Sequence, residues 1–374
     1  MTVTRGTLNG TSRTRLSHAV TTKALIWSKF RRNKLAITSG IVLLAIYSVC
    51  LISEFFAPYS QADSSRYNFL PPQRIHFVDN RGRYHLRPFV YGIAREIDYN
   101  SLSIKFTENK DKKYYLQFFV KRLKSQSGPG RYQQIVRLFG VEDGGFIFLL
   151  GTDYRGRDLL TQILYGGRVT LTVGLFGVFL STIIGIILGT VSGYFGGVID
   201  MLIQRLIEIL SSIPRLPLWM AMAAILPPKW PSTYVYWGIV TVLALIGWCG
   251  LARQIRAKVL SVRERDFVMA SRAGGAGDGH IMARHIIPNV LSHIIVVTTL
   301  ALPSMILAES AMSFLGLGIR PPMTSWGLLL QNAQNLFAIR SAPWVMIPGL
   351  FIMISVLCFN FLGDGLRDAA DPYN

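Results

Sequence analysis

Cysteine is scarce in this sequence, with only Cys50, Cys249 and Cys358 among 374 residues. All three lie inside apolar runs, which does not fit a disulfide framework for an external domain. We expect them to be small buried hydrophobic residues.

Two kinds of chemical site are missing as well. The phosphate-binding pattern G-x-x-x-x-G-K-[ST] does not occur, so the chain cannot hold ATP in a P-loop. His280, His285 and His293 have no cysteine or carboxylate beside them in a metal-ligand spacing. The sequence therefore predicts no catalytic site, no metal and no cofactor bound by the chain itself.

Acidic residues are few, with 20 Asp and Glu against 39 Lys and Arg, which gives a formal net charge of +19. Such a charge is typical of nucleic-acid binding, but the cations are in the wrong places for it. Residues 1–34 hold eight Lys or Arg and no acid, and residues 253–284 hold seven against three acids. Both segments border apolar runs, which is the positive-inside pattern of a membrane protein and argues against nucleic acid as a partner.

Long apolar runs are abundant. A helix needs about 20 apolar residues to cross the hydrocarbon layer of a membrane. Five stretches meet this requirement, at about 35–56, 169–192, 232–252, 289–308 and 343–363. A sixth, at about 198–226, is added because the topology requires it.

The doubtful sixth span contains Arg205, Glu208, Arg215 and two prolines. A charge within a span costs at least a few kcal/mol unless it is paired or lies near the interface. Arg205 and Glu208 are three residues apart, so they can form an ion pair on one helix face. We expect such a pair near a helix end, in preference to a place along a transport path.

These observations predict an all-α polytopic membrane protein with six transmembrane helices. Residues 1–34 form a basic cytoplasmic segment with no cleavable signal peptide, so the first span is a retained anchor. The positive-inside rule then places both termini and the loop 253–288 in the cytoplasm.

Residues 57–148 are the largest polar block, and the topology places them outside the membrane as an inserted, mainly β, periplasmic domain. Alternating runs around turn-forming residues predict three β-hairpins, IHFVD-NRG-RYHL, SIKFT-ENKD-KKYYLQFFV and VRLFGVE-DGG-FIFLL, with a loop at Ser125–Gly130. Tyr84, Phe89 and Tyr91 are expected to be exposed aromatic residues that contact another protein.

The loop MASRAGGAGDGHIMARHIIPN, residues 269–289, carries the most specific pattern. It resembles the EAA loop of ABC importer permeases, in which E-A-A is followed by three residues and a glycine and then, after a spacer, by a hydrophobic residue and proline. Ala270, Gly275, Ile286 and Pro288 stand at the matching places, whereas Met269 replaces the usual glutamate and Ser271 the usual alanine. Glycine permits a turn forbidden to residues with a Cβ, and proline suits the first turn of the following helix.

The resemblance implies a coupling helix that lies in a groove of an ATPase subunit. The residues to which it assigns this role are Met269, Ala270, Ser271, Arg272, Ala273, Gly274, Gly275, Ala276, Gly277, Asp278 and Pro288.

Four further blocks, which begin at Leu150, Ser192, Glu309 and Phe359, resemble the C-type permeases of dipeptide and oligopeptide importers. The resemblance covers residues 20–56 and 150–372. It implies the type I importer permease fold, with residues 149–374 as the core, in the bacterial inner membrane. It also implies a B-type permease as heterodimer partner, two ATPase subunits that use ATP and Mg, and a periplasmic solute-binding protein.

Other functions remain open at this stage. The same architecture imports oligosaccharides, nickel complexes and peptide antibiotics in related systems. A secondary transporter would also have several spans, but it should show an internal repeat and ionisable residues at the membrane midplane. A hydrolase could use Ser192 with His293, although no nucleophile motif surrounds Ser192.

Overall fold

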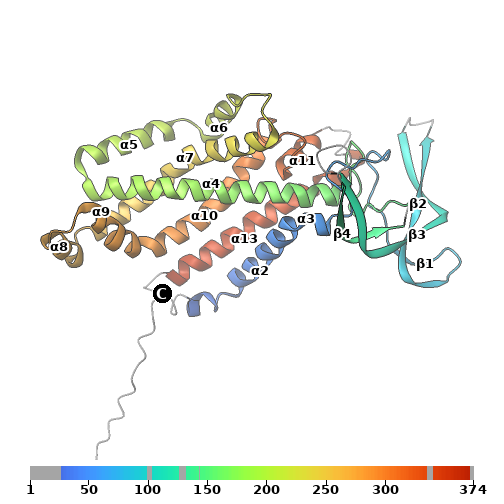
Figure 1. The fold of residues 1–374 in the computed structure, drawn as a ribbon, viewed down its shortest axis with the longest axis horizontal. Helices are drawn as coiled ribbons and strands as arrows, with labels where there is room; N and C mark the ends of the chain where they lie inside the picture. Colours follow the sequence, from blue (N-terminus) through green and yellow to red (C-terminus); the bar gives the residue numbers. More distant parts are fainter. Residues whose placement is uncertain (1–26, 99–102, 126–131, 143, 335–339, 371–374) are drawn as a thin grey trace, which may run out of the picture.

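The computed structural model describes residues 27–98, 103–125, 132–142, 144–334 and 340–370. Within these ranges the chain forms a bundle of long helices with a four-stranded sheet at one end (Figure 1). The short helix α8 (Asp266–Ala273) lies at the opposite end of the bundle. We call these two ends the sheet end and the α8 end.

Five helical stretches of the described residues are long and apolar enough to cross a membrane: Lys34–Leu51, Leu159–Phe195, Ser232–Val262, Asp278–Phe314 and Pro343–Ala370. They comprise α2 (Lys34–Leu51), α4 (Leu159–Phe195), α7 (Ser232–Val262), α9 (Asp278–Ile281) with a π-helical turn (Met282–Ile286) and α10 (Ile287–Phe314), and a 3₁₀ turn (Pro343–Met346) with α13 (Ile347–Ala370). The helical membrane architecture expected from the apolar runs is thus present.

The sixth predicted span, 198–226, is not one straight helix. It consists of α5 (Gly197–Ser212) and α6 (Arg215–Ala224), which meet at an angle of 88°. Pro214 lies at the break, where it cannot donate a helical hydrogen bond, and it disfavours the α conformation of the residue before it. The segment predicted as the sixth span is therefore bent in the middle, and the pair counts as a sixth span only as a broken one.

The glycines of α4 allow α7 to approach closely. A Cβ on Gly189 would lie 2.6 Å from the carbonyl oxygen of Ala252, and one on Gly185 would lie 2.9 Å from Leu251 Cβ. A Cβ on Gly193 would lie 2.8 Å from Val259 Cβ. The three glycines are spaced four residues apart, so they form the small-residue stripe on which membrane helices pack.

The sheet has the order β1 (His76–Val78), β2 (Tyr84–Asp98), β3 (Ser103–Ser125) and β4 (Tyr132–Val141), all antiparallel. The first predicted hairpin is confirmed, since β1 pairs with β2 around Gly82, which has φ = 73°. This small sheet supports the inserted β domain in part.

The other two predicted hairpins were wrong. Residues 103–120 belong to the single strand β3, because β2 pairs with it on both sides of residues 110–112, where the register shifts. Residues 146–149 form no strand: the backbone N–H of Ile147 donates to Tyr59 Oη and that of Phe148 to Gln73 Oε1. Turn-forming residues indicate a chain reversal only where the segments on either side of them pair with each other in the fold. Of the predicted loop Ser125–Gly130, only Ser125 belongs to the described residues.

Two aromatic residues expected to be exposed are buried instead. Phe89 and Tyr91 lie in the face of β2 that packs against His76, with ring centroids 6.0 and 4.9 Å from that imidazole. Tyr84, at the start of β2, is exposed as expected.

Asp79 closes the β1–β2 turn. Its Oδ1 accepts the backbone N–H groups of Arg81 and Arg83 at 2.8 and 3.0 Å, and its Oδ2 accepts Lys113 Nζ at 2.8 Å. The hydrogen bond from Lys113 and those from the backbone hold the pKa of Asp79 well below its usual range. A carboxylate of this kind stabilises the fold above its unfolded pKa, and the contribution is lost as the pH falls towards the lowered value.

We therefore expect Asp79→Asn to loosen the β1–β2 hairpin at neutral pH. Hydrogen exchange of peptides from residues 76–98 should be faster than in the wild type at pH 7, and the difference should shrink below about pH 4 as the wild-type carboxylate is protonated. A difference that stays constant down to the lowest pH would show that the charge of Asp79 contributes nothing.

Candidate coupling surface

At the α8 end, the chain leaves the bundle and returns within a short distance. Helix α7 continues to Val262, α8 follows from Asp266, and the next long helix begins at Asp278. Pro288 stands in the first turn of α10, as the sequence suggested, and the helical run that leads into α10 begins ten residues earlier, at Asp278, through α9 and the π-helical turn. Pro288 has no N–H to donate, and the adjoining turn Met282–Ile286 is π-helical.

A Schellman motif ends α8. The N–H of Gly275 donates to the carbonyl of Arg272 at 3.0 Å, and that of Ala276 donates to the carbonyl of Ser271 at 3.1 Å. This pattern requires a left-handed residue just after the helix, and Gly275 has φ = 81°. The turn that the sequence assigned to Gly275 is present.

One face of α8 is anchored to the bundle. Val268 is buried among the apolar side chains of Tyr194, Ile255, Ile281 and Ile286. The two flanks of the helix on either side of Val268 are open, with Phe267 39% and Met269 51% exposed. An open apolar surface at the tip of a bundle marks a place where another protein can pack.

Polar contacts fix the return of the chain. Tyr194 of α4 donates its hydroxyl to Asp278 Oδ1 at 2.6 Å, and the guanidinium of Arg272 lies 5.3 Å from the centre of the Tyr194 ring. The phenol of Tyr194 raises the pKa of Arg272, which keeps the cation charged. These contacts tie α8 and Asp278 to the end of α4.

A second cluster joins α4, α5 and α7 nearby. Asp200 Oδ1 and Oδ2 accept Arg256 Nε and Nη2, each at 2.5 Å, and Ser192 donates its hydroxyl to Asp200 at 2.5 Å. Gln204 Nε2 donates to Ser192 at 3.1 Å. Ser192 is thus a hydrogen-bonding residue between helices, which leaves it no place in a Ser/His nucleophile pair.

The predicted coupling residues from Met269 to Asp278 form one continuous helix and turn, whereas Pro288 lies apart from them. Sequence reasoning missed Phe267, although an apolar residue in a charged loop was a usable signal. It also missed the Tyr194–Asp278 and Asp200–Arg256 contacts, which join residues 84 and 56 positions apart.

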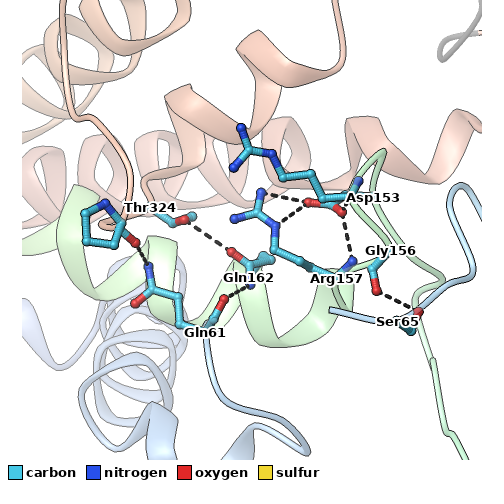
Figure 2. Close-up of polar contacts among 9 residues, drawn as sticks. Gln61, Ser65, Asp153, Gly156, Arg157, Gln162 and Thr324 are labelled. Atoms are coloured by element: carbon cyan, nitrogen blue, oxygen red, sulfur yellow. Dashed lines mark hydrogen bonds and ion pairs between the residues drawn. The ribbon is translucent and has the colours of Figure 1, made fainter. Parts of the chain in front are cut away.

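The sheet end is held rigidly by a second polar network (Figure 2). Gln162 of α4 is fully buried; its Nε2 donates to the carbonyl of Gln61 at 2.9 Å, and its Oε1 accepts Thr324 Oγ1 at 3.2 Å. Gln61 Nε2 donates in turn to the carbonyl of Pro322 at 2.8 Å. This network ties α4 to the segments before the sheet and after α10.

Beside this network lies a cavity of about 520 Å³ between α3 (Ser53–Phe56), α4 and α7. Glu54 and Arg168 give its wall charges of both signs, and Phe176 and Trp237 give it aromatic surfaces. Such a lining can contact a ligand that carries both charges and apolar groups.

Comparisons with known proteins match most of the helical part of the chain. The family described as binding-protein-dependent transport system inner membrane component matches residues 182–373. The family described as the N-terminal TM domain of oligopeptide transport permease C matches residues 23–72.

Individual relatives agree. The "Dipeptide transport system permease protein DppC" of Alkalihalophilus pseudofirmus is 45% identical over 223 residues, which cover 59% of this chain and 71% of that one. The "Oligopeptide transport system permease protein OppC" of Haemophilus influenzae is 44% identical over 223 residues, with coverages of 59% and 69%. Among solved structures, an inward-facing form of the MetNI methionine ABC transporter is 17% identical and covers 56% of this chain and 96% of the matching chain, with a TM-score of 0.42.

Proposed function

The chain belongs to the family of binding-protein-dependent transport system inner membrane components, and from this premise we propose that it is a permease subunit of an importer for dipeptides or oligopeptides. It forms half of the translocation pathway and hydrolyses no ATP itself. The observation that carries the proposal is the α8 surface, because it presents the motif of the family's coupling loop at the tip of the bundle.

Two separate ATPase subunits supply the energy in this proposal, using ATP and Mg. Phe267 and Met269 pack into a groove of one ATPase, while Val268 holds α8 to the bundle. Closure of the ATPases then moves α4 and α10 through the Tyr194–Asp278 and Schellman contacts.

A second, B-type permease covers the broken span α5–α6. Arg205 Nη1 lies 2.9 Å from Glu208 Oε2, so the ion pair allowed by their spacing does form, and both side chains are mostly exposed in this chain. An ion pair facing lipid tails would cost several kcal/mol, so this face is better placed against a protein partner or an aqueous path.

The sheet end faces the periplasm, where a solute-binding protein delivers the peptide, and both termini lie in the cytoplasm of a bacterial inner-membrane protein. The cavity at this end, with Glu54 and Arg168, suits a short peptide that carries an ammonium and a carboxylate. Importers of oligosaccharides, nickel complexes or peptide antibiotics share the architecture, so the solute must be tested directly.

The test is transport by the assembled complex. The chain is tagged in its host, purified with its partners and reconstituted in liposomes with its binding protein and a labelled dipeptide. We expect uptake that requires ATP and all the subunits. ATP-dependent uptake of an oligosaccharide or nickel complex, without uptake of the peptide, would show that the assigned substrate class is wrong. Transport without any ATPase would overturn the whole proposal.

The orientation can be tested by cysteine labelling. Met269→Cys and Leu86→Cys place thiols at two exposed positions at opposite ends of the molecule, and Cys50 and Cys249 are buried. In intact spheroplasts, a membrane-impermeant maleimide should label Leu86→Cys and spare Met269→Cys; after lysis it should label both. The reverse pattern would invert the topology.

A further inference from the structure

Phe118 and Phe119 are adjacent in β3 and both exposed, at 61% and 63%. Neighbouring side chains of a regular strand point to opposite faces of the sheet, so one ring of such a pair normally packs against the core. Here Phe119 has φ = 55°, between the ladder pairs Phe118–Phe139 and Val120–Arg137. A left-handed conformation is strained for a bulky residue, and rings that are mostly exposed offset little of this strain by packing inside the protein.

The pair lies directly beside the end of a membrane span. The Phe119 ring is 6.3 Å from that of Phe55 in α3, and α3 begins two residues after α2 ends at Leu51. Phe55 is four residues beyond that end, a distance of about 6 Å along the axis at the rise of an α-helix. The headgroup layer on each side of the hydrocarbon core is about 5–8 Å thick.

The hairpin β3–β4 is fixed at this depth by a buried cation. Arg137 of β4 donates from Nη1 to the carbonyl of Ala57 at 3.2 Å and from Nη2 to Ser60 Oγ at 3.0 Å. Both acceptors follow α3 in the chain, so β4 cannot move away from the end of the span without breaking these bonds.

We propose that Phe118 and Phe119 insert into the lipid headgroup layer at the sheet end, so that the β3–β4 hairpin lies against the bilayer. Aromatic side chains at this depth are a recurrent anchor of membrane proteins. Lys121, which is exposed two residues later, reaches the phosphates of the same layer. Lipid is favoured over a protein occupant because the patch is continuous with the membrane span through Phe55.

The experiment compares Phe118→Cys with Leu86→Cys, each carrying a nitroxide, in the complete transporter. Leu86 is 88% exposed in β2, two strands away from β4, so it is a matched position on the same sheet. Cys50, Cys249 and Cys358 are replaced by serine or alanine in both variants. The complex is reconstituted in vesicles of phosphatidylethanolamine with a minority of phosphatidylglycerol.

Two collision rates of the label are measured, one with oxygen, which concentrates in lipid, and one with a water-soluble nickel chelate. Their ratio, the oxygen-to-nickel ratio, is compared between the two positions. At residue 118 we expect the oxygen-to-nickel ratio to exceed that at residue 86 by about threefold or more. Equal ratios would place the rings in water and overturn the inference. A label at residue 118 that is shielded from both reagents would mean that another protein covers the patch, which also overturns it.

The variant Phe119→Gly gives a second measurement that does not depend on labelling. Glycine accepts φ = 55° without strain, so the fold should be retained while one ring is removed. With the label at residue 118, which already replaces the Phe118 ring, the oxygen-to-nickel ratio should fall towards that at residue 86, because the remaining ring of the pair is gone. An unchanged ratio would show that Phe119 does not hold the hairpin on the membrane.

Discussion

Replacing Gly275 with proline is expected to abolish peptide uptake while leaving the protein in the membrane. Proline fixes φ near −65° and has no N–H, whereas Gly275 has φ = 81° and donates to the carbonyl of Arg272. The Schellman motif cannot form, so α8 and Asp278 lose their relative placement. On the proposed coupling role, uptake and peptide-stimulated ATPase activity should each fall by about tenfold or more, since a mismatched proline costs about 3 kcal/mol.

The cause is the backbone conformation and not a lack of space, because a Cβ on Gly275 would meet no atom within 4 Å. Gly275→Glu should therefore also impair coupling, through the strain of a left-handed residue, while Gly275→Asn should retain much of it. Gly277 is the matched control: a Cβ there is equally free, but its φ is −70°, so Gly277→Ala should transport normally.

Membrane levels and transport are measured together for all four variants. Normal uptake and normal ATPase stimulation by Gly275→Pro would contradict the coupling role. Loss of the protein from the membrane would instead assign Gly275 to folding, and the Gly275→Asn variant separates the two results because it preserves the turn.

Replacing Glu309 with alanine is expected to destabilise the helix bundle strongly. Glu309 is completely buried in α10, where Ser313 Oγ donates to its Oε1 at 2.7 Å and Ser310 contacts its Oε2 at 3.4 Å. The hydroxyls of Thr170 and Ser325 also hydrogen-bond to this carboxyl group. They come from α4 and from the residue that caps α11 (Trp326–Asn332), so one side chain joins three elements.

Alanine would leave several buried hydroxyls without this partner, at about 1–3 kcal/mol for each group left unsatisfied. The midpoint of thermal unfolding in detergent should fall clearly, and less protein should accumulate in the membrane. Glu309→Gln keeps an oxygen and the side-chain length, and hydroxyls can both donate and accept, so most of the stability should remain.

The matched control is Glu208→Ala, which removes an exposed carboxylate from another candidate membrane helix and should change the unfolding midpoint little. If Glu309→Gln were as damaging as Glu309→Ala, the negative charge itself would be required and the hydroxyl network would not explain the site. If neither variant were destabilised, Glu309 would have no structural role.

Local patterns in the sequence were sufficient where the relevant forces are local or come from the solvent. Apolar length fixes which segments can cross a bilayer, because an unsatisfied backbone group in lipid costs several kcal/mol in any fold. The turn at Gly275 was equally readable, since only glycine adopts φ = 81° at low cost. The Asp79 turn with Gly82 followed from the same chemistry.

The failures in the sheet involve partners distant in the chain. ENKD looks like a reversal, but β2 continues to pair with β3 across it. In a strand with one exposed face, Phe89 and Tyr91 would lie on the face opposite Val90. All three residues are buried, because both faces of β2 are covered here. The role of the α4 glycines likewise depends on a distant partner, because it is to leave room for α7, which approaches within the space of a Cβ.

The sequence by itself therefore determined that this is a membrane permease, where most of its spans lie and which loop resembles the family's coupling motif, because hydropathy, charge bias and glycine conformation act within a few residues. Only the tertiary structure decided that the span at 198–226 is broken, that Tyr194 and Arg256 brace the α8 end, and that Phe118 and Phe119 lie beside the end of α2. Each of these depends on contacts between residues far apart in the chain or on the angle between helices, and short-range patterns do not encode either.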